Sequence, residues 1–312
     1  MYNAFSNGYA HSRSGDLKAM SRMKLVALFL IICCCANFFL LGNGIGAAED
    51  ETEARTNPLP VEKTETYHSN FFRDEAEIWT APFHLDLKNA LLWGTVLVGT
   101  AVLISNDEGI YENFKRYQSN HSWVDKVSPK ITLLGDWGID CGIAGLFLLS
   151  GLAFKDQKAR DTGLMALETL LHTGLLVQVV KHLAGRQRPW VENGIDHWYG
   201  PGAFFKRYSQ NFFSRYDSFF SGHTVSAWGL ATVIAENYKN HFWVPLTCYG
   251  LATAVGLSRL TEDDHWLSDV FVGAVVGYAI GKMVVRNQNS RLQLAPAVTA
   301  GGLGLALSYE IK

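Results

Sequence analysis

The chain is poor in charged residues and in cysteines. Only 18% of its 312 residues are charged, whereas soluble domains carry about 25%, and this shortage favours contact with a membrane. Its five cysteines include no pair with the spacing of zinc ligands. A formal net charge of −2 leaves no broad basic face, so the composition does not favour a nucleic acid as partner. The mean hydropathy of +0.04 is nevertheless low for a mostly transmembrane protein.

Residues 1–48 have the pattern of a secretory signal peptide or an N-terminal anchor. Polar residues ending in basic ones precede an apolar run at 25–41, and small residues lead up to Ala48. This order predicts cleavage after Ala48, although the length of the run also permits an uncleaved anchor. Residues 49–87 are expected to be a linker and an amphipathic segment, with a surface helix within 71–83.

Six apolar segments follow, and they predict an all-α bundle of about six core helices in a domain at 88–285. Several are shorter than the ~20 residues that a membrane span needs, so a bundle partly or wholly outside lipid stays open. Residues 286–312 alternate apolar with small or polar residues, which predicts a short C-terminal β-hairpin. The apolar segments are 88–105, 137–154, 162–183, 223–237, 242–258 and 266–285.

Three clusters of charged and hydrogen-bonding residues stand at the ends of these segments. The first closes the third segment, the second opens the fourth, and the third lies between the end of the fifth and the start of the sixth. Alternate helices of an up-down bundle end on the same side, so we predict that the clusters meet at one end of the bundle. Their residues are Lys181 and Arg188; Ser221, Gly222 and His223; and Arg259, His265 and Asp269.

These residue types suit the transfer of a phosphoryl group. Such a group carries charge on its oxygens, so catalysis depends mainly on positioning and charge stabilisation. Lys181, Arg188 and Arg259 supply positive charge. The backbone N–H of Gly222, at the start of a helix, suits an anion, and Ser221 can donate a further hydrogen bond.

Two histidines suit the roles of nucleophile and proton donor. His265 and Asp269 are four residues apart, on one face of a helix. A carboxylate there can hold one ring nitrogen protonated and leave the other free to attack phosphorus. His223 can protonate the leaving oxygen and then deprotonate water.

The three clusters resemble the motifs of the type 2 phosphatidic acid phosphatase (PAP2)/vanadium haloperoxidase superfamily. The signature K-x6-R-P, P-S-G-H and S-R-x5-H-x3-D is present with its spacing intact, except that Phe220 replaces the usual Pro, which should loosen the loop. The resemblance implies a helical bundle, a phosphohistidine at His265, His223 as acid and base, Asp269 as orienter, and no metal or other cofactor. The phosphate ligands that it implies are Lys181, Arg188, Ser221, Gly222 and Arg259.

The resemblance and the apolar segments together imply a membrane-associated phosphatase for phosphomonoesters or pyrophosphates of lipids. Its partners would be a lipid phosphate and the membrane of the cell envelope, with the active site on the periplasmic or extracellular side. The alternative is a soluble secreted acid phosphatase of the same superfamily, which the signal-like start and the short segments favour. A haloperoxidase fits less well because those chains are usually much longer. A non-catalytic envelope protein would not need the complete set of motif residues.

A few polar residues fall outside the signature. Arg186 is either a packing residue or an auxiliary phosphate contact. The acidic run at 262–264 is expected to be a solvated loop face, and His172 a packing residue inside the third apolar segment.

Overall fold

The protein is described here by a computed structural model. The predicted signal or anchor at 1–48 and the linker that follows it lie outside the described residues. The chain divides into two compact units, each described by itself: Leu87–Leu103 belongs to one, and the second contains the helix at 71–80 and the chain from Ile104 onward. The described residues are 71–81, 87–191, 194–201, 215–299 and 302–311.

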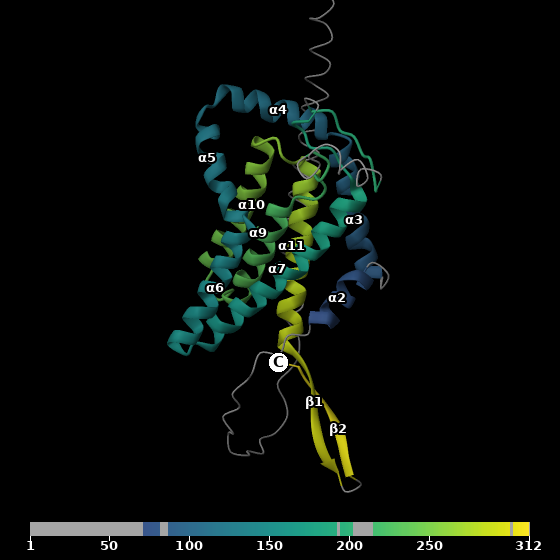
Figure 1. Ribbon diagram of the computed structural model, residues 1–312, viewed down its shortest axis with the longest axis vertical. Coiled ribbons are helices and arrows are strands. Elements are labelled where there is room, and N and C mark those ends of the chain that lie inside the picture. The colour runs from purple at the N-terminus through teal and green to yellow at the C-terminus, as the bar shows by residue number, and fades with distance from the viewer. Residues whose placement is uncertain (1–70, 82–86, 192–193, 202–214, 300–301, 312) are drawn as a thin grey trace, which may run out of the picture. The chain divides into compact units, whose positions relative to one another are not determined.

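All six apolar segments form helices, which confirms the predicted all-α fold class (Figure 1). Helix α2 (Phe71–Thr80) also confirms the surface helix expected within 71–83. The six helices are α3 (Leu87–Ile104), α6 (Trp137–Phe154), α7 (Gln157–Ala184), α9 (Gly222–Asn237), α10 (Trp243–Thr261) and α11 (Leu267–Asn289).

Two further helices were not predicted, α4 (Asp107–Asn120) and α5 (Trp123–Thr132), and α5 runs into a short 3₁₀ turn, η2 (Leu133–Gly135). Helix α4 is largely polar, so it contains no apolar run to mark it. Acidic residues in its first turn favour a helix start because they complement the positive end of the helix dipole.

The C-terminal hairpin is present as predicted. Strand β1 (Ser290–Thr299) pairs antiparallel with β2 (Gly302–Ile311). The register runs from Ser290 opposite Ile311 to Thr299 opposite Gly302.

Helix α9 lies at the centre of the second unit and packs against α7, α10 and α11 (Figure 1). Glycines let α9 approach both α11 and α7 closely. A Cβ atom at Gly277 of α11 would lie 2.4 Å from the carbonyl oxygen of Val225 on α9, and one at Gly229 of α9 would lie 2.9 Å from Cγ2 of Thr169 on α7. A side chain at either position would therefore force the helices apart.

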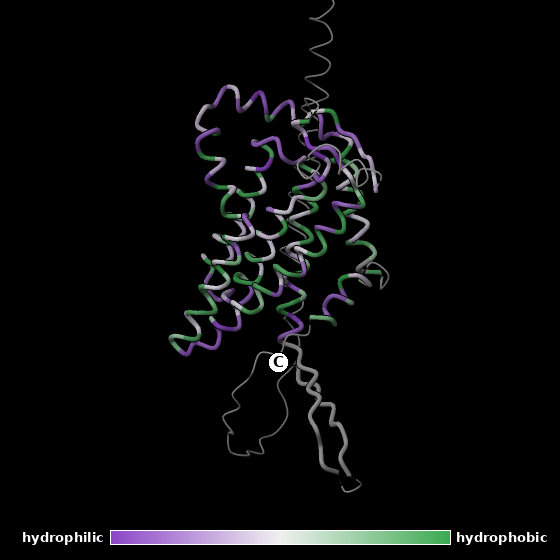
Figure 2. The backbone as a smooth tube through the Cα atoms, in the orientation of Figure 1, coloured by the Kyte–Doolittle hydropathy of each residue, from purple (hydrophilic) through white to green (hydrophobic). Residues whose placement is uncertain are grey.

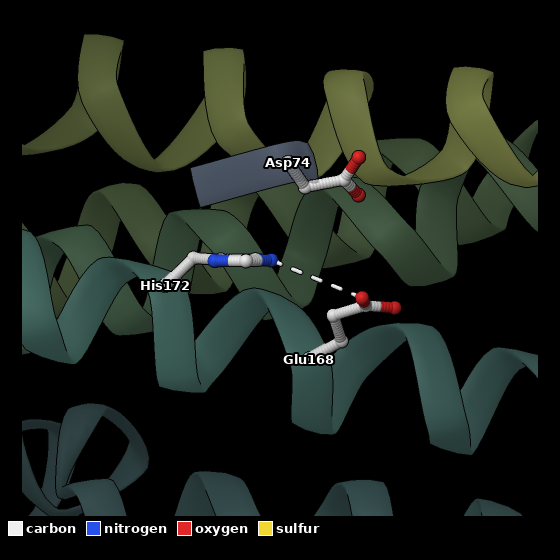
Figure 3. Close-up of side chains that lie close together, drawn as sticks. All are labelled: Asp74, Glu168 and His172. Carbon is white, nitrogen blue, oxygen red and sulfur yellow. Dashed lines mark ion pairs between the residues drawn. The ribbon is translucent and has the colours of Figure 1, made fainter. Parts of the chain in front are cut away.

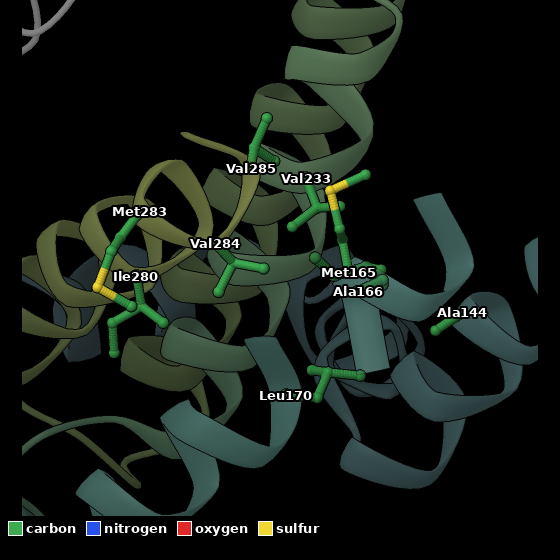
Figure 4. Close-up of a cluster of buried hydrophobic side chains, with 10 residues drawn as sticks. Ala144, Met165, Ala166, Leu170, Val233, Ile280, Met283, Val284 and Val285 are labelled. Atoms are coloured by element: carbon green, nitrogen blue, oxygen red, sulfur yellow. The ribbon is translucent and has the colours of Figure 1, made fainter. Parts of the chain in front are cut away.

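The main apolar core is shared by α6, α7, α9 and α11 (Figure 4). It fixes the mutual positions of α7, α9 and α11, three of the helices whose ends carry motif residues. Its buried members are Ala144, Met165, Ala166, Leu170, Leu230, Val233, Ile280, Met283, Val284 and Val285.

Helix caps set where the motif residues stand. Helix α7 ends at Gly185, whose left-handed φ of 55° lets its N–H donate to the carbonyl oxygen of Lys181. Lys181 is therefore in the last turn of α7. At the start of α9, the side chain of Ser221 caps the helix by accepting from the N–H of Thr224.

Three described helices are long and apolar enough to cross a membrane, namely α6, α7 and α11. The number rises to four if α3 and α4, which are separated by a bend, count as one span. Figure 2 shows the hydrophobic colouring along α6 and the largely hydrophilic colouring of α4. Helices α9 and α10 do not meet these limits of length and composition.

Candidate active site

The three motifs meet at one end of the bundle, as predicted. The indole N–H of Trp266, just before α11, donates to the carbonyl oxygen of Gln187, which follows α7 (2.8 Å). The backbone N–H of Ser221, just before α9, donates to the carbonyl oxygen of Asp269 on α11 (3.2 Å). These bonds tie the end of α7 and the starts of α9 and α11 together.

His265 and Asp269 lie side by side at the start of α11. Nδ1 of His265 is 3.6 Å from Oδ2 of Asp269, an ion-pair distance that is longer than a hydrogen bond. The same Oδ2 accepts hydrogen bonds from the backbone N–H of Trp266 (3.0 Å) and from the hydroxyl of Ser218 (2.5 Å). The carboxylate is therefore held in place independently of the histidine.

The environment of His265 favours its neutral form. Its side chain is almost fully buried, and burial lowers its pKa to about 3. Asp269 opposes this shift, whereas the positive charges of Arg188 and Lys181 add to it. At neutral pH the ring is uncharged and keeps the lone pair that a nucleophile requires.

His223 lies in the first turn of α9, among the cations of the site. Burial, followed by the positive charges of Arg259 and Lys181, lowers its pKa to about 4. His223 is therefore a proton acceptor at neutral pH. An anion bound beside it would raise the pKa and allow it to act as an acid.

Two carboxylates bridge the three cations that the motifs contribute. Asp217 is 3.6 Å from Nζ of Lys181 and accepts from Nε of Arg188 (2.9 Å). Asp264 pairs with Arg188 (2.9 Å) and with Arg259. Burial alone would raise the pKa values of both carboxyls, but these cations lower them, so both stay ionised. Their oxygens bridge the cations as the oxygens of a phosphate could.

The acidic run at 262–264 is not the solvated loop face that was expected. Glu262 pairs with Arg259 (2.6 Å) and Asp263 with Lys115 of α4 (2.6 Å), while Asp264 joins the cations of the site. The only sequence feature that could have suggested a role for Asp264 in the site is its position immediately before His265. A local run of acidic residues does not show which basic side chains those residues will contact in the fold.

Ser221 and Gly222 lie at the start of α9, beside Lys181. The hydroxyl oxygen of Ser221 accepts from the N–H (3.4 Å) and the hydroxyl (2.8 Å) of Thr224, and its own proton can still be donated to an anion. A Cβ atom at Gly222 would lie 3.9 Å from Nζ of Lys181, an ordinary contact. The packing around Gly222 therefore does not by itself demand glycine.

Phe220, which replaces the usual proline, is 3% exposed. Its ring belongs to a buried cluster with Val177 of α7 and Val225 of α9. This packing anchors the segment before Ser221, which offsets the loosening expected from the loss of proline.

Arg186 is fully buried and points toward the carboxylates behind the site. Its NH1 donates to Oδ1 of Asp269 (2.6 Å) and to the hydroxyl of Ser268 (2.7 Å). Its NH2 donates to Asp107 of α4 (2.8 Å) and to Asp196 (2.7 Å). The guanidinium is committed to these partners, so the structure favours a packing role over an auxiliary phosphate contact.

The model of the PAP2 superfamily matches residues 162–293 of the chain. This stretch contains all three motifs, so the resemblance seen in the sequence is confirmed for residues 162–293. The boundaries 88–285 stay a prediction.

The chain is also similar to named proteins. It is 28% identical to the lipid A 1-phosphatase of Porphyromonas gingivalis over 203 residues, which are 63% of this chain and 38% of that protein. The crystal structure of Aquifex aeolicus LpxE has a TM-score of 0.42, with 20% identity, over 56% of this chain and 94% of that one. A transmembrane PAP2 type phosphatidylglycerolphosphate phosphatase from Bacillus subtilis has a TM-score of 0.46, with 22% identity, over 69% and 92%.

Proposed function

We propose that the chain is a membrane-associated phosphatase that hydrolyses phosphomonoesters or pyrophosphates of lipids through a phosphohistidine intermediate. The observation that carries the proposal is the placement of neutral His265 beside Asp269, at the end of the bundle where Lys181, Arg188 and Arg259 converge. The proposed chemistry uses these side chains and no cofactor.

In the first step, the free ring nitrogen of His265 attacks phosphorus and the bond to the leaving oxygen breaks. The three cations stabilise the charge on the equatorial oxygens. His223, protonated while the anion is bound, gives its proton to the leaving oxygen. Asp269 stabilises the positive charge that develops on the ring of His265.

In the second step, water replaces the histidine on phosphorus. His223, now neutral, takes a proton from the attacking water. The bond between phosphorus and the ring nitrogen breaks, which releases inorganic phosphate and restores neutral His265. Ser221 and the backbone N–H of Gly222 hold the phosphate oxygens through both steps.

Lipid A 1-phosphate is one candidate substrate, because a relative bears that activity in its name. The test is the release of inorganic phosphate by the full chain in detergent, from lipid A, phosphatidic acid and an isoprenoid pyrophosphate, compared with p-nitrophenyl phosphate. We expect kcat/KM to be at least ~10-fold higher for one of the lipids, since burial of its chains adds binding energy. Equal values for the lipids and the soluble ester would favour a non-specific acid phosphatase.

The location in the cell envelope rests on the signal-like N-terminus and on the apolar helices α6, α7 and α11. We propose membrane association with the active site on the periplasmic or extracellular side. Fractionation with and without detergent separates this proposal from a soluble secreted enzyme, because a membrane protein is extracted only with detergent.

Vanadate is expected to inhibit the enzyme, and EDTA to leave its turnover unchanged. Vanadate can adopt five-coordinate geometry, which resembles the transition state of attack by His265. Since a histidine and three cations supply the proposed chemistry, removal of metal ions should not slow it. Initial rates of phosphate release measure both effects, and a loss of activity in EDTA that magnesium restores would contradict the mechanism.

The pH profile of kcat/KM should have its maximum between about pH 4 and 6. The pKa of His223 is about 4, and the second pKa of a phosphomonoester is about 6. Below about pH 4 both His223 and the phosphate group are protonated, and above about pH 6 neither is. The reaction needs a single proton, on either His223 or the phosphate group. Because the pKa of His265 is about 3, protonation of its ring, which would remove the nucleophile, occurs only at still lower pH.

The control compares an alkyl phosphate with p-nitrophenyl phosphate, whose leaving group departs without protonation. We expect the wild-type profile to fall above about pH 6 with the alkyl phosphate and much less with p-nitrophenyl phosphate, and we expect His223→Gln to lose more activity on the alkyl phosphate. An equal loss by His223→Gln on both substrates would show that His223 is not the proton donor.

A further inference from the structure

A second cluster of ionisable side chains is buried between α2 and α7, away from the motifs. Asp74 projects from α2, and Glu168 and His172 project from α7 (Figure 3). The three are almost completely buried. Each offers one ligand atom, and these atoms all lie within 4.8 Å of one another. Phosphoryl transfer as proposed above makes no use of this cluster.

The imidazole of His172 presents an unused nitrogen to the two carboxylates. Its Nδ1 lies 2.7 Å from Oε1 of Glu75, and the ring stacks on Phe71 with 4.6 Å between the ring centres. Its Nε2 is buried and has no hydrogen-bond partner within the described part of the chain. The facing oxygen of Glu168 is 3.9 Å away (Figure 3).

This pattern of partners is the one found at metal-binding histidines. A histidine that binds a metal through one nitrogen usually donates the other N–H to a carboxylate, which fixes the tautomer and the ring orientation. Glu75 fills that role for His172. Asp74 is oriented in the same way, because Nδ2 of Asn287 donates to its Oδ1 (2.9 Å).

The distances and charges also suit a cation. Tetrahedral donors that are each about 2.1 Å from one metal ion are ~3.4 Å apart. The 3.9 Å between His172 and Glu168 and the separations of up to 4.8 Å within the cluster would therefore close by small side-chain rotations around an ion. The buried carboxyl groups of Asp74 and Glu168 would attract a divalent cation at this position.

We propose that Asp74, Glu168 and His172 bind a divalent transition-metal ion that ties α2 to α7. One imidazole nitrogen and two carboxylate oxygens suit Zn²⁺, which takes a water as fourth ligand where the protein supplies three, better than Mg²⁺ or Ca²⁺, which prefer oxygen alone. His172 precedes Lys181 by nine residues on α7, or about 13 Å along the helix. The ion therefore supports the fold and takes no part in phosphoryl transfer.

The test measures zinc binding by the full chain in detergent, after treatment with EDTA and dialysis against Zn²⁺ alone. We expect one Zn²⁺ per chain and a rise in the unfolding temperature of about 5 °C. Glu168→Gln and Asp74→Asn should lose both effects. Glu75→Gln should keep the site but weaken its affinity by about 10–100-fold. His182→Ala, on the same helix, is the matched control and should behave as the wild type.

Two outcomes would overturn the proposal. One is less than one Zn²⁺ bound per wild-type chain, a measurement that does not depend on whether any variant folds. The other is equal binding by the wild type and folded Glu168→Gln, which would leave His172 as a charged link between Glu75 and Glu168. Turnover below the unfolding temperature is measured separately. A loss of turnover in EDTA would contradict the metal-free chemistry proposed for the active site, but it would not contradict the metal site between α2 and α7.

Discussion

Replacing His265 with alanine is expected to abolish phosphate release while leaving the fold intact. Removal of a nucleophile from a comparable catalytic unit costs on the order of 10⁴-fold or more in kcat. His265 is buried beside Asp269 and near the positive charges of Arg188 and Lys181, so no neighbouring group can take over the attack on phosphorus. The measurement is the initial rate of phosphate release, with circular dichroism as a folding control.

Related variants separate the nucleophile from its helpers. His223→Ala and Arg259→Ala are each expected to lose at least ~100-fold, since proton transfer and charge stabilisation contribute about that much. His182→Ala is the control, because His182 is a half-buried histidine on α7 whose Nδ1 contacts the carbonyl oxygen of Gln178 in the same helix. Rapid-quench trapping should show an acid-labile phosphoenzyme in the wild type. Turnover by His265→Ala at the rate of the wild type would contradict the proposed mechanism.

Arg186→Met is expected to destabilise the protein by about 3–5 kcal/mol. The substitution leaves Asp107, Asp196 and Asp269 buried without the cation that all three share. For a domain of this size, the loss corresponds to a fall of at least ~6 °C in the unfolding temperature. The measurement is thermal unfolding of the detergent-solubilised chain.

Two further substitutions test whether Arg186 also positions Asp269. Arg186→Lys keeps the positive charge, but a single ammonium group cannot donate to the partners of both NH1 and NH2. We therefore expect a smaller loss of stability than for Arg186→Met, and a fall in kcat with little change in KM. Arg160→Met breaks a partly exposed pair with Asp161 and should cost no more than about 1 kcal/mol. If Arg186→Met were as mild as Arg160→Met, the buried network would not hold the site together.

The sequence predicted the helices because the signal that forms them is local. An apolar run long enough for a helix and bounded by turns marks a buried segment, and all six such runs became helices. The same signal missed α4, which has no apolar run although its Asp107 reaches Arg186. The hairpin was predicted for the same local reason, the alternation of residues along both strands.

The motifs also determined which residues gather at the candidate site. Lys181, Arg188, Arg259, His223 and His265 stand at ends of apolar segments that an up-down bundle must bring to the same side. Their convergence therefore followed from the order of the segments along the chain. Their catalytic roles stay a prediction until variants are measured.

Only the tertiary structure decided the partners of the buried charges. Arg186 meets Asp107 across 79 residues of sequence, and His172 meets Glu75 across 97. The energy of a buried charge depends on its neighbours in space, and packing of the helices selects those neighbours. For that reason the sequence by itself identified the helices and the chemical groups. The contacts of Arg186 with Asp107, Asp196 and Asp269, and the cluster between α2 and α7, were determined only by the packing of the helices.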